Sequence, residues 1–145
     1  MGYIRCPLTL PEGVESVRLS DEGFVLALSV DSWLNRLPVI NSAHLHNENF
    51  ILPEQVVGTL QVAAQGAFVP KLGAQPGGLV AVIALVSLGQ GVAVVPESVV
   101  GHVSLPNVVY RQINDCNASS WLALIHRRFE KSPAVVRYIE RVKNR

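Results

Sequence analysis

The stretch Leu72–Pro96 contains no ionisable residue, and this feature constrains the fold more than any other. A run of about 20 apolar residues can cross a bilayer as a single helix. Here Pro76-Gly77-Gly78 and Gly89-Gln90-Gly91 interrupt the run, because such residues break or end helices. No Trp or Tyr flanks it as an interfacial anchor. We therefore predict a buried helix over 79–88, a tight turn and a short strand over 92–95 rather than a membrane span.

Composition favours one globular chain with a real core. The chain has 145 residues, of which 49% are hydrophobic and 16% are charged, which is not typical of disorder. Cys6 and Cys116 are too few for a disulfide scaffold. Arg5, Pro7 and Pro11 interrupt the start, so we find no secretory signal and expect a cytoplasmic location.

The charge is small but uneven. A net charge of +1 gives no global field for binding a polyanion. Seven of the twelve Lys and Arg lie from Arg127 onward, on or near the last predicted helix. This pattern is typical of a solvated helix face, and it also leaves open a basic surface that docks a partner.

Strands and helices are predicted to alternate along the chain. Continuous apolar strands such as FVLAL and VAVV favour an α/β fold with a largely parallel sheet. We expect the apolar 79–88 helix to be buried on most faces. The predicted strands are 2–6, 16–20, 24–30, 50–52, 69–74, 92–95, 108–113 and 121–127, and the predicted helices are 32–36, 55–66, 79–88 and 133–143.

An ordered set of segments resembles one known family. LVSLGQGVAVVPESV at 85–99 is similar to a signature of the effector-binding domain of LysR-type transcriptional regulators. Further segments follow in the family's order over nearly the whole chain: GYIRCPL (2–8), SVRLSDEGFVLALSVDSWL (16–34), FILPEQ (50–55), LQVAAQGAFVPKL (60–72), VVYRQI (108–113) and WLALIHRRFEKSPAVVRYIERV (121–142).

The resemblance implies an α/β, periplasmic-binding-protein-like (type 2) fold with mainly parallel sheets in two lobes. Residues 21–112 would form a complete lobe II, and residues 1–20 and 113–145 would form a partial lobe I. The family's domain starts upstream of GYIRCPL and follows a DNA-binding domain, so we expect this chain to be an N-terminally truncated fragment. Unpaired strand edges invite pairing, and we therefore expect a homo-oligomer.

Two loops are candidates for effector binding. Ligands of open parallel sheets bind beyond the carboxyl ends of strands, at helix starts with free N–H groups that favour anions. One candidate is the turn Gln75, Pro76, Gly77 and Gly78, and the other is the loop Pro53, Glu54 and Gln55. An ordinary capped helix start is the alternative for both.

The resemblance places the effector between the lobes at these two loops. The family commonly has Ser or Thr where this chain has Gly78, so backbone amides and Gln75 would serve instead. Arg5 is the candidate for binding a carboxylate through its guanidinium, and a surface arginine at a strand end is the alternative.

Other chemistries have weaker support. His44 and His46 form an H-x-H pair near Glu48 without further metal ligands, so we predict no metal and no cofactor. Redox sensing through Cys6 and Cys116 lacks a visible activating group. No catalytic motif is present, and we predict that the chain is not an enzyme.

We therefore predict a ligand-sensing regulatory domain that binds a small, anionic organic effector. DNA would be bound only through the missing N-terminal domain, and no membrane would be involved. Two alternatives remain: a solute-binding lobe of a periplasmic receptor, and an orphan protein-interaction module that uses its sheet edge or its basic last helix.

Overall fold

The computed structural model describes residues 1–6, 10–117 and 119–144, without the side chains of residues 4–6, 20 and 119–122. The chain divides into two compact units, and each is described by itself. Unit 1 consists of Met1–Glu22 and Ser120–Arg145, and unit 2 is Gly23–Ser119. The sequence predicts lobe boundaries between residues 20 and 21 and between residues 112 and 113.

Unit 1 is a small sheet with one helix. Strands β1 (Gly2–Cys6) and β7 (Ser119–Arg127) pair antiparallel, and β7 also pairs with β2 (Val14–Ser29). Helix α3 (Pro133–Lys143) begins with proline at its first turn, where no N–H is needed. Its apolar face packs Ile139 and Val142 with Leu124 of β7 in a small core.

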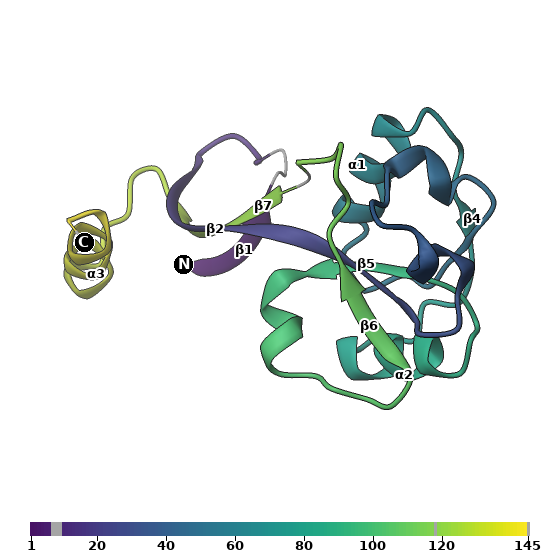
Figure 1. Cartoon of the computed structure of the whole chain (residues 1–145). Coiled ribbons are helices and arrows are strands. Elements are labelled where there is room, and N and C mark those ends of the chain that lie inside the picture. Colours follow the sequence, from purple (N-terminus) through teal and green to yellow (C-terminus); the bar gives the residue numbers. More distant parts are fainter. Residues whose placement is uncertain (7–9, 118, 145) are drawn as a thin grey trace. The chain divides into compact units, whose positions relative to one another are not determined.

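Unit 2 contains the larger sheet (Figure 1). The end of β2 pairs antiparallel with β5 (Ala93–Pro96) and with β6 (Val108–Arg111). Strands β3 (Asn49–Phe50) and β4 (Lys71–Leu72) pair in parallel. Parallel bridges join Phe50 to Val92 and Ile40 to Ile113. The spatial order is therefore β4, β3, β5, β2, β6 and then the segment at Ile40.

Helices cover both faces of this sheet. Helix α1 (Val57–Gln65) contacts β5, and helix α2 (Leu79–Ser87) contacts β5 and β6. Short 3-10 helices are η1 (Trp33–Arg36), η2 (Ser42–Leu45) and η3 (Glu97–Gly101). The sequence predicted η1 as a helix and missed η2 and η3.

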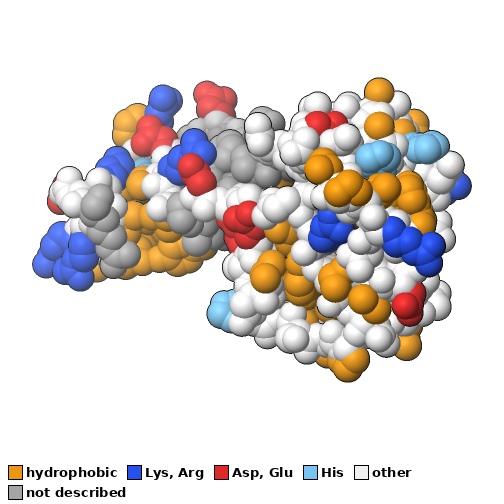
Figure 2. Space-filling view, viewed as in Figure 1, with side chains coloured by type: hydrophobic (Ala, Val, Ile, Leu, Met, Phe, Trp, Pro, Cys, Tyr) orange, Lys and Arg blue, Asp and Glu red, His pale blue; other side chains and the backbone are white. Residues whose placement is uncertain are grey.

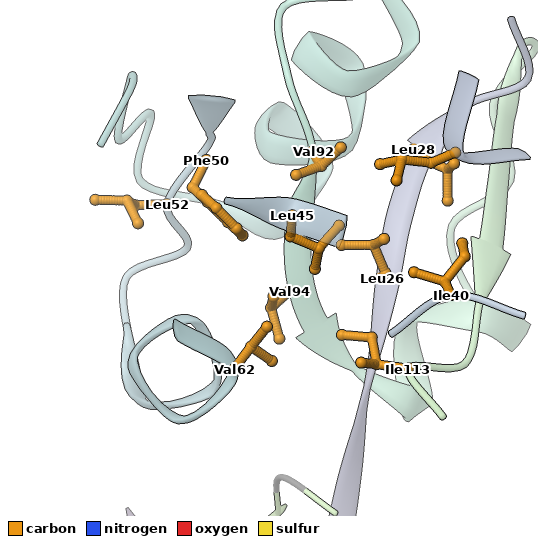
Figure 3. Close-up of a cluster of buried hydrophobic side chains, with 11 residues drawn as sticks. Leu26, Leu28, Ile40, Leu45, Phe50, Leu52, Val62, Val92, Val94 and Ile113 are labelled. Atoms are coloured by element: carbon orange, nitrogen blue, oxygen red, sulfur yellow. The ribbon is translucent and has the colours of Figure 1, made fainter. Parts of the chain in front are cut away.

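Alternation along β2 and β5 produces two cores. Leu26, Leu28 and Val94 point to the core that includes Val62 of α1 (Figure 3). Their neighbours Val25, Ala27, Ala93 and Val95 join the core that includes Val82, Ile83 and Val86 of α2. Because successive strand side chains alternate between faces, apolar residues at every position mark a sheet covered on both sides.

Three predictions about the fold need correction. The sheets are mixed rather than mainly parallel, because β2 runs antiparallel to β5 and β6. The predicted strands 16–20 and 24–30 are one strand, β2. The predicted helix 79–88 is not buried on most faces: Val80 of α2 is 63% exposed, and Leu88, its C-cap, is 72% exposed. The α/β class and the break at residues 76–78 agree with the structure, and no helix in the described part of the chain is long and apolar enough to cross a bilayer.

Candidate functional site

The two loops predicted as ligand-binding segments lie side by side in unit 2. The side-chain amide Nε2 of Gln75 donates a hydrogen bond to the carbonyl oxygen of Pro53 over 3.0 Å. Backbone hydrogen bonds from Leu52 to Ala74 (2.9 Å) and from Gly73 to Phe50 (2.7 Å) extend this pairing. The parallel pairing of β3 with β4 therefore carries both loops to the same end of the sheet.

Both loops end at helix starts without a side-chain cap. Gly78 is the N-cap of α2 with extended backbone angles (φ −97°, ψ 153°), and Val56 is the N-cap of α1. Gly77 has φ +100°, a left-handed conformation that disfavours residues with a Cβ. The first N–H groups of α2 lack intrahelical partners, so they are available to an anion.

The charges of the two loops differ. Residues Glu54 and Gln55 are exposed, as are Gln75, Pro76, Gly77 and Gly78, while Pro53 is buried. Glu54 is the only charged side chain among these predicted site residues of unit 2. Its carboxylate lies near the start of α1, where it suits the helix dipole and repels another anion. The start of α2 is therefore the better anion position.

The remaining predicted site residue, Arg5, belongs to unit 1. Its backbone lies in β1 opposite Leu122 of β7. Its side chain lies outside the described residues, as does that of Cys6. The part of Arg5 in effector binding stays a prediction.

The histidine pair is engaged locally. The Asn41 backbone N–H donates to Nδ1 of His44 over 2.9 Å, and Nδ1 of His46 lies 2.9 Å from the carbonyl oxygen of Ala43. The structure shows no group of three or more metal-binding side chains in the part of the chain that it describes. Cys116 is a half-buried free thiol.

Sequence reasoning missed two polar contacts of unit 2. Asp115 accepts hydrogen bonds from the backbone N–H and the hydroxyl of Ser42. Partial desolvation raises the pKa of Asp115, but the Ser42 bonds, its own backbone N–H and nearby His44 outweigh this, so the pKa lies below its ordinary value. Arg111 donates to the backbone oxygens of Leu37 and Pro38 over 2.7 and 3.2 Å.

Arg111 also lines a cavity of about 370 Å³ with Pro38, Val39, Ile40, Tyr110, Gln112 and Asn114. The hydroxyl of Tyr110 donates to the carbonyl oxygen of Val103 over 2.7 Å, and burial raises the pKa of that phenol. The sequence offered only a weak signal for this cavity, because VVYRQI reads as an ordinary strand with alternating polarity.

A family model described as the LysR substrate binding domain matches residues 1–145. The chain belongs to this family. It is therefore an effector-binding domain of the LysR type, with the fold that the segment order implied. The family match favours a regulator over the periplasmic receptor lobe and the orphan interaction module. Among curated proteins, none matches this chain.

Solved structures show the same fold at low sequence identity. The effector-binding domain of QuiR in complex with shikimate has a TM-score of 0.80 at 19% identity, covering 98% of this chain and 70% of that one. The BenM effector-binding domain with its effector benzoate has a TM-score of 0.76 at 18% identity, and the match covers 99% of this chain and 67% of that one. Full-length CbnR complexed with its target DNA has a TM-score of 0.79 at 20% identity, and the match covers 99% of this chain and 52% of that one. This LysR-type domain thus spans about half of a full-length regulator.

Proposed function

We propose that this LysR-type domain senses a small organic carboxylate at the paired loops of unit 2. The observation that carries the proposal is the hydrogen bond from Gln75 to Pro53, which holds the two loops together beside the start of α2. The effector carboxylate accepts hydrogen bonds from the free N–H groups that follow Gly78. The domain binds this molecule without converting it chemically.

Local geometry supports a carboxylate rather than a cation. The turn Gln75–Gly78 carries no acidic side chain, and no side chain caps α2. The helix dipole and unpaired N–H groups both favour negative charge. Arg5 remains the proposed second contact, because a guanidinium binds a carboxylate through two parallel hydrogen bonds.

Two similar domains have acids as ligands. The QuiR domain was solved with shikimate and the BenM domain with benzoate, and both compounds carry one carboxylate on a six-membered ring. At 18–19% identity these relatives support the fold, so they suggest the chemical class of effector rather than its identity.

In the whole regulator, effector binding would change how a homo-oligomer places its DNA-binding domains. A ligand shifts such an equilibrium only through different affinity for the two states. CbnR, solved with its target DNA, supports a DNA-binding role for a full-length relative. We propose the same role for this protein, through a separate domain and in the cytoplasm.

Calorimetric titration of the chain with shikimate and with benzoate tests the proposal. We expect saturable binding that Gln75→Ala weakens about tenfold, because the variant frees the loop that carries the anion-binding turn. Gln90→Ala is the matched control, since Gln90 is an exposed glutamine at the other end of α2. Equal affinities of both variants for each acid would contradict the assigned site.

A further inference from the structure

The guanidinium of Arg111 is half-buried and surrounded by neutral acceptors. Its Nη2 atom donates to the carbonyl oxygens of Leu37 and Pro38, as described above. Its Nη1 atom lies 3.3 Å from the backbone oxygen and 3.4 Å from Oδ1 of Asn35. Within the described ranges, no carboxylate lies within ion-pair distance of Arg111. A partly buried charge without a counter-charge favours binding an anion.

The cavity beside Arg111 offers donors and apolar walls together. Nε of Arg111 and the side-chain amide of Asn114 make no hydrogen bond to the residues that the structure describes. Pro38, Val39 and Ile40 supply an apolar wall, and Val39 is 47% exposed. Figure 2 shows basic side chains standing among hydrophobic ones on the visible face of unit 2.

Acidic groups near this cavity already have partners. Gln112 lines the cavity, and its Nε2 donates to Oε1 of Glu97 over 3.3 Å. Asp115, next to Asn114 in the chain, is held by Ser42. No acidic residue lines the cavity. The local charge at the cavity wall is therefore that of the Arg111 guanidinium.

The cavity lies at the opposite edge of the sheet from the proposed effector loops. β3 and β4, which carry those loops, stand at one edge, and β6 with the segment at Ile40 stands at the other. β5 and β2 separate the two edges. A ligand in the cavity would therefore occupy a distinct site.

We propose that this cavity is a second anion site, which binds a small organic acid with a compact apolar body. The carboxylate accepts hydrogen bonds from Nε of Arg111 and from the amide of Asn114. The apolar body lies against Pro38 and Val39. The cavity is open to solvent, and its volume of about 370 Å³ has room for a single ring.

Residue-resolved NMR of the whole chain tests this site with cyclohexanecarboxylate as the probe. We expect saturable shifts of the Arg111 Nε–H, the Asn114 side-chain amide and the backbone at 38–40. Cyclohexanecarboxamide, which is neutral and has the same ring, should bind at least about tenfold more weakly. Shifts confined to 53–55 and 75–78 would overturn the second site while supporting the effector loops, so the two proposals can fail separately.

Asn114→Asp is the decisive variant. It leaves the bonds of Arg111 to Leu37 and Pro38 in place and puts a negative charge into the cavity, so affinity for cyclohexanecarboxylate should fall about tenfold. Arg36→Gln is the control, because it removes a nearby exposed positive charge that does not line the cavity. Equal weakening by both variants would indicate general electrostatic attraction and overturn the site.

Discussion

Both carboxylate oxygens of Asp115 accept hydrogen bonds from Ser42, whose backbone N–H lies 2.8 Å from Oδ1 and whose hydroxyl lies 2.7 Å from Oδ2. Ser42 is fully buried at the first turn of η2, and Asp115 is exposed and distant in sequence. The pair therefore fastens the segment that follows β6 to the start of η2. Because the bonds go to a carboxylate, the strength of this connection depends on pH.

Asp115→Asn should weaken unit 2 near neutral pH and not in acid. The folded-state pKa of Asp115 is lowered, so its contribution is present above the unfolded-state pKa and is lost as pH falls through the folded-state pKa. Urea unfolding of both proteins between about pH 3 and 7 should show a stability difference that closes toward the acid end. A difference that is constant with pH would contradict this assignment.

Ser42→Ala supplies the companion measurement. It removes one hydrogen bond, which contributes about 1 kcal/mol to stability. Water can replace the lost bond at Asp115 because that carboxylate is exposed, so we expect a value at the lower end of the usual range. The destabilisation caused by Ser42→Ala should also become smaller in acid.

Thr59→Val should stabilise the protein. Thr59 is fully buried in α1, and its Oγ1 has no hydrogen-bond partner. Valine has nearly the same shape and helix propensity, so removing the unpaired hydroxyl should gain about 1 kcal/mol. Thr59→Ser is the control: it keeps the hydroxyl and loses a buried methyl group, so the thermal midpoint should fall. A lower midpoint for Thr59→Val would show that the hydroxyl has a stabilising partner.

Gly77 and Gly78 should respond oppositely to substitution, although a Cβ would meet no atom within 4 Å at either position. Gly77→Ala should destabilise the protein by about 1 kcal/mol, because φ is +100° there. Gly78→Ser should raise stability by a few tenths of a kcal/mol, because its extended backbone suits a serine N-cap. Thermal melts of both variants check this, and equal midpoints would contradict the backbone geometry.

Gly58→Ala tests how closely α1 packs on the sheet. In an exposed helix the change would stabilise by about 1 kcal/mol. Here the new Cβ would lie 2.9 Å from side-chain atoms of both Phe24 and Val94, so we expect overpacking and a net loss of about 1–3 kcal/mol. Phe24→Leu in the Gly58→Ala background should recover part of that loss. Unchanged stability of the single variant would mean that the helix moves away without cost.

The sequence predicted the features that depend on local chemistry. Pro76-Gly77-Gly78 interrupts the apolar run where α2 begins, and the predicted helix 133–143 coincides with α3. Strand direction was not predictable, because an apolar run buried on both faces looks the same in parallel and antiparallel sheets. Strands 16–20 and 24–30 were predicted separately, but pairing on either side of residues 21–23 keeps β2 continuous.

The candidate site was likewise predictable from the sequence only in part. The rule that ligands bind beyond the carboxyl ends of parallel strands predicted that both loops lie at one end of the sheet. The hydrogen bond from Gln75 to Pro53 could be seen only in the structure. Arg111 was missed because its partners are backbone carbonyls of Leu37 and Pro38, just after η1, and side-chain identity does not reveal such acceptors.

The pairing of β1 with β7 has a consequence for how the molecule is made. Gly2 lies opposite Ile125, so β1 cannot pair with β7 until all of unit 2, which separates them in the sequence, has left the ribosome. Unit 2 is an uninterrupted segment and can assemble during this interval, which shortens the loop that β1 and β7 must close. The β1–β7 pairing of unit 1 therefore forms only after the segment that carries both proposed anion sites has been synthesised.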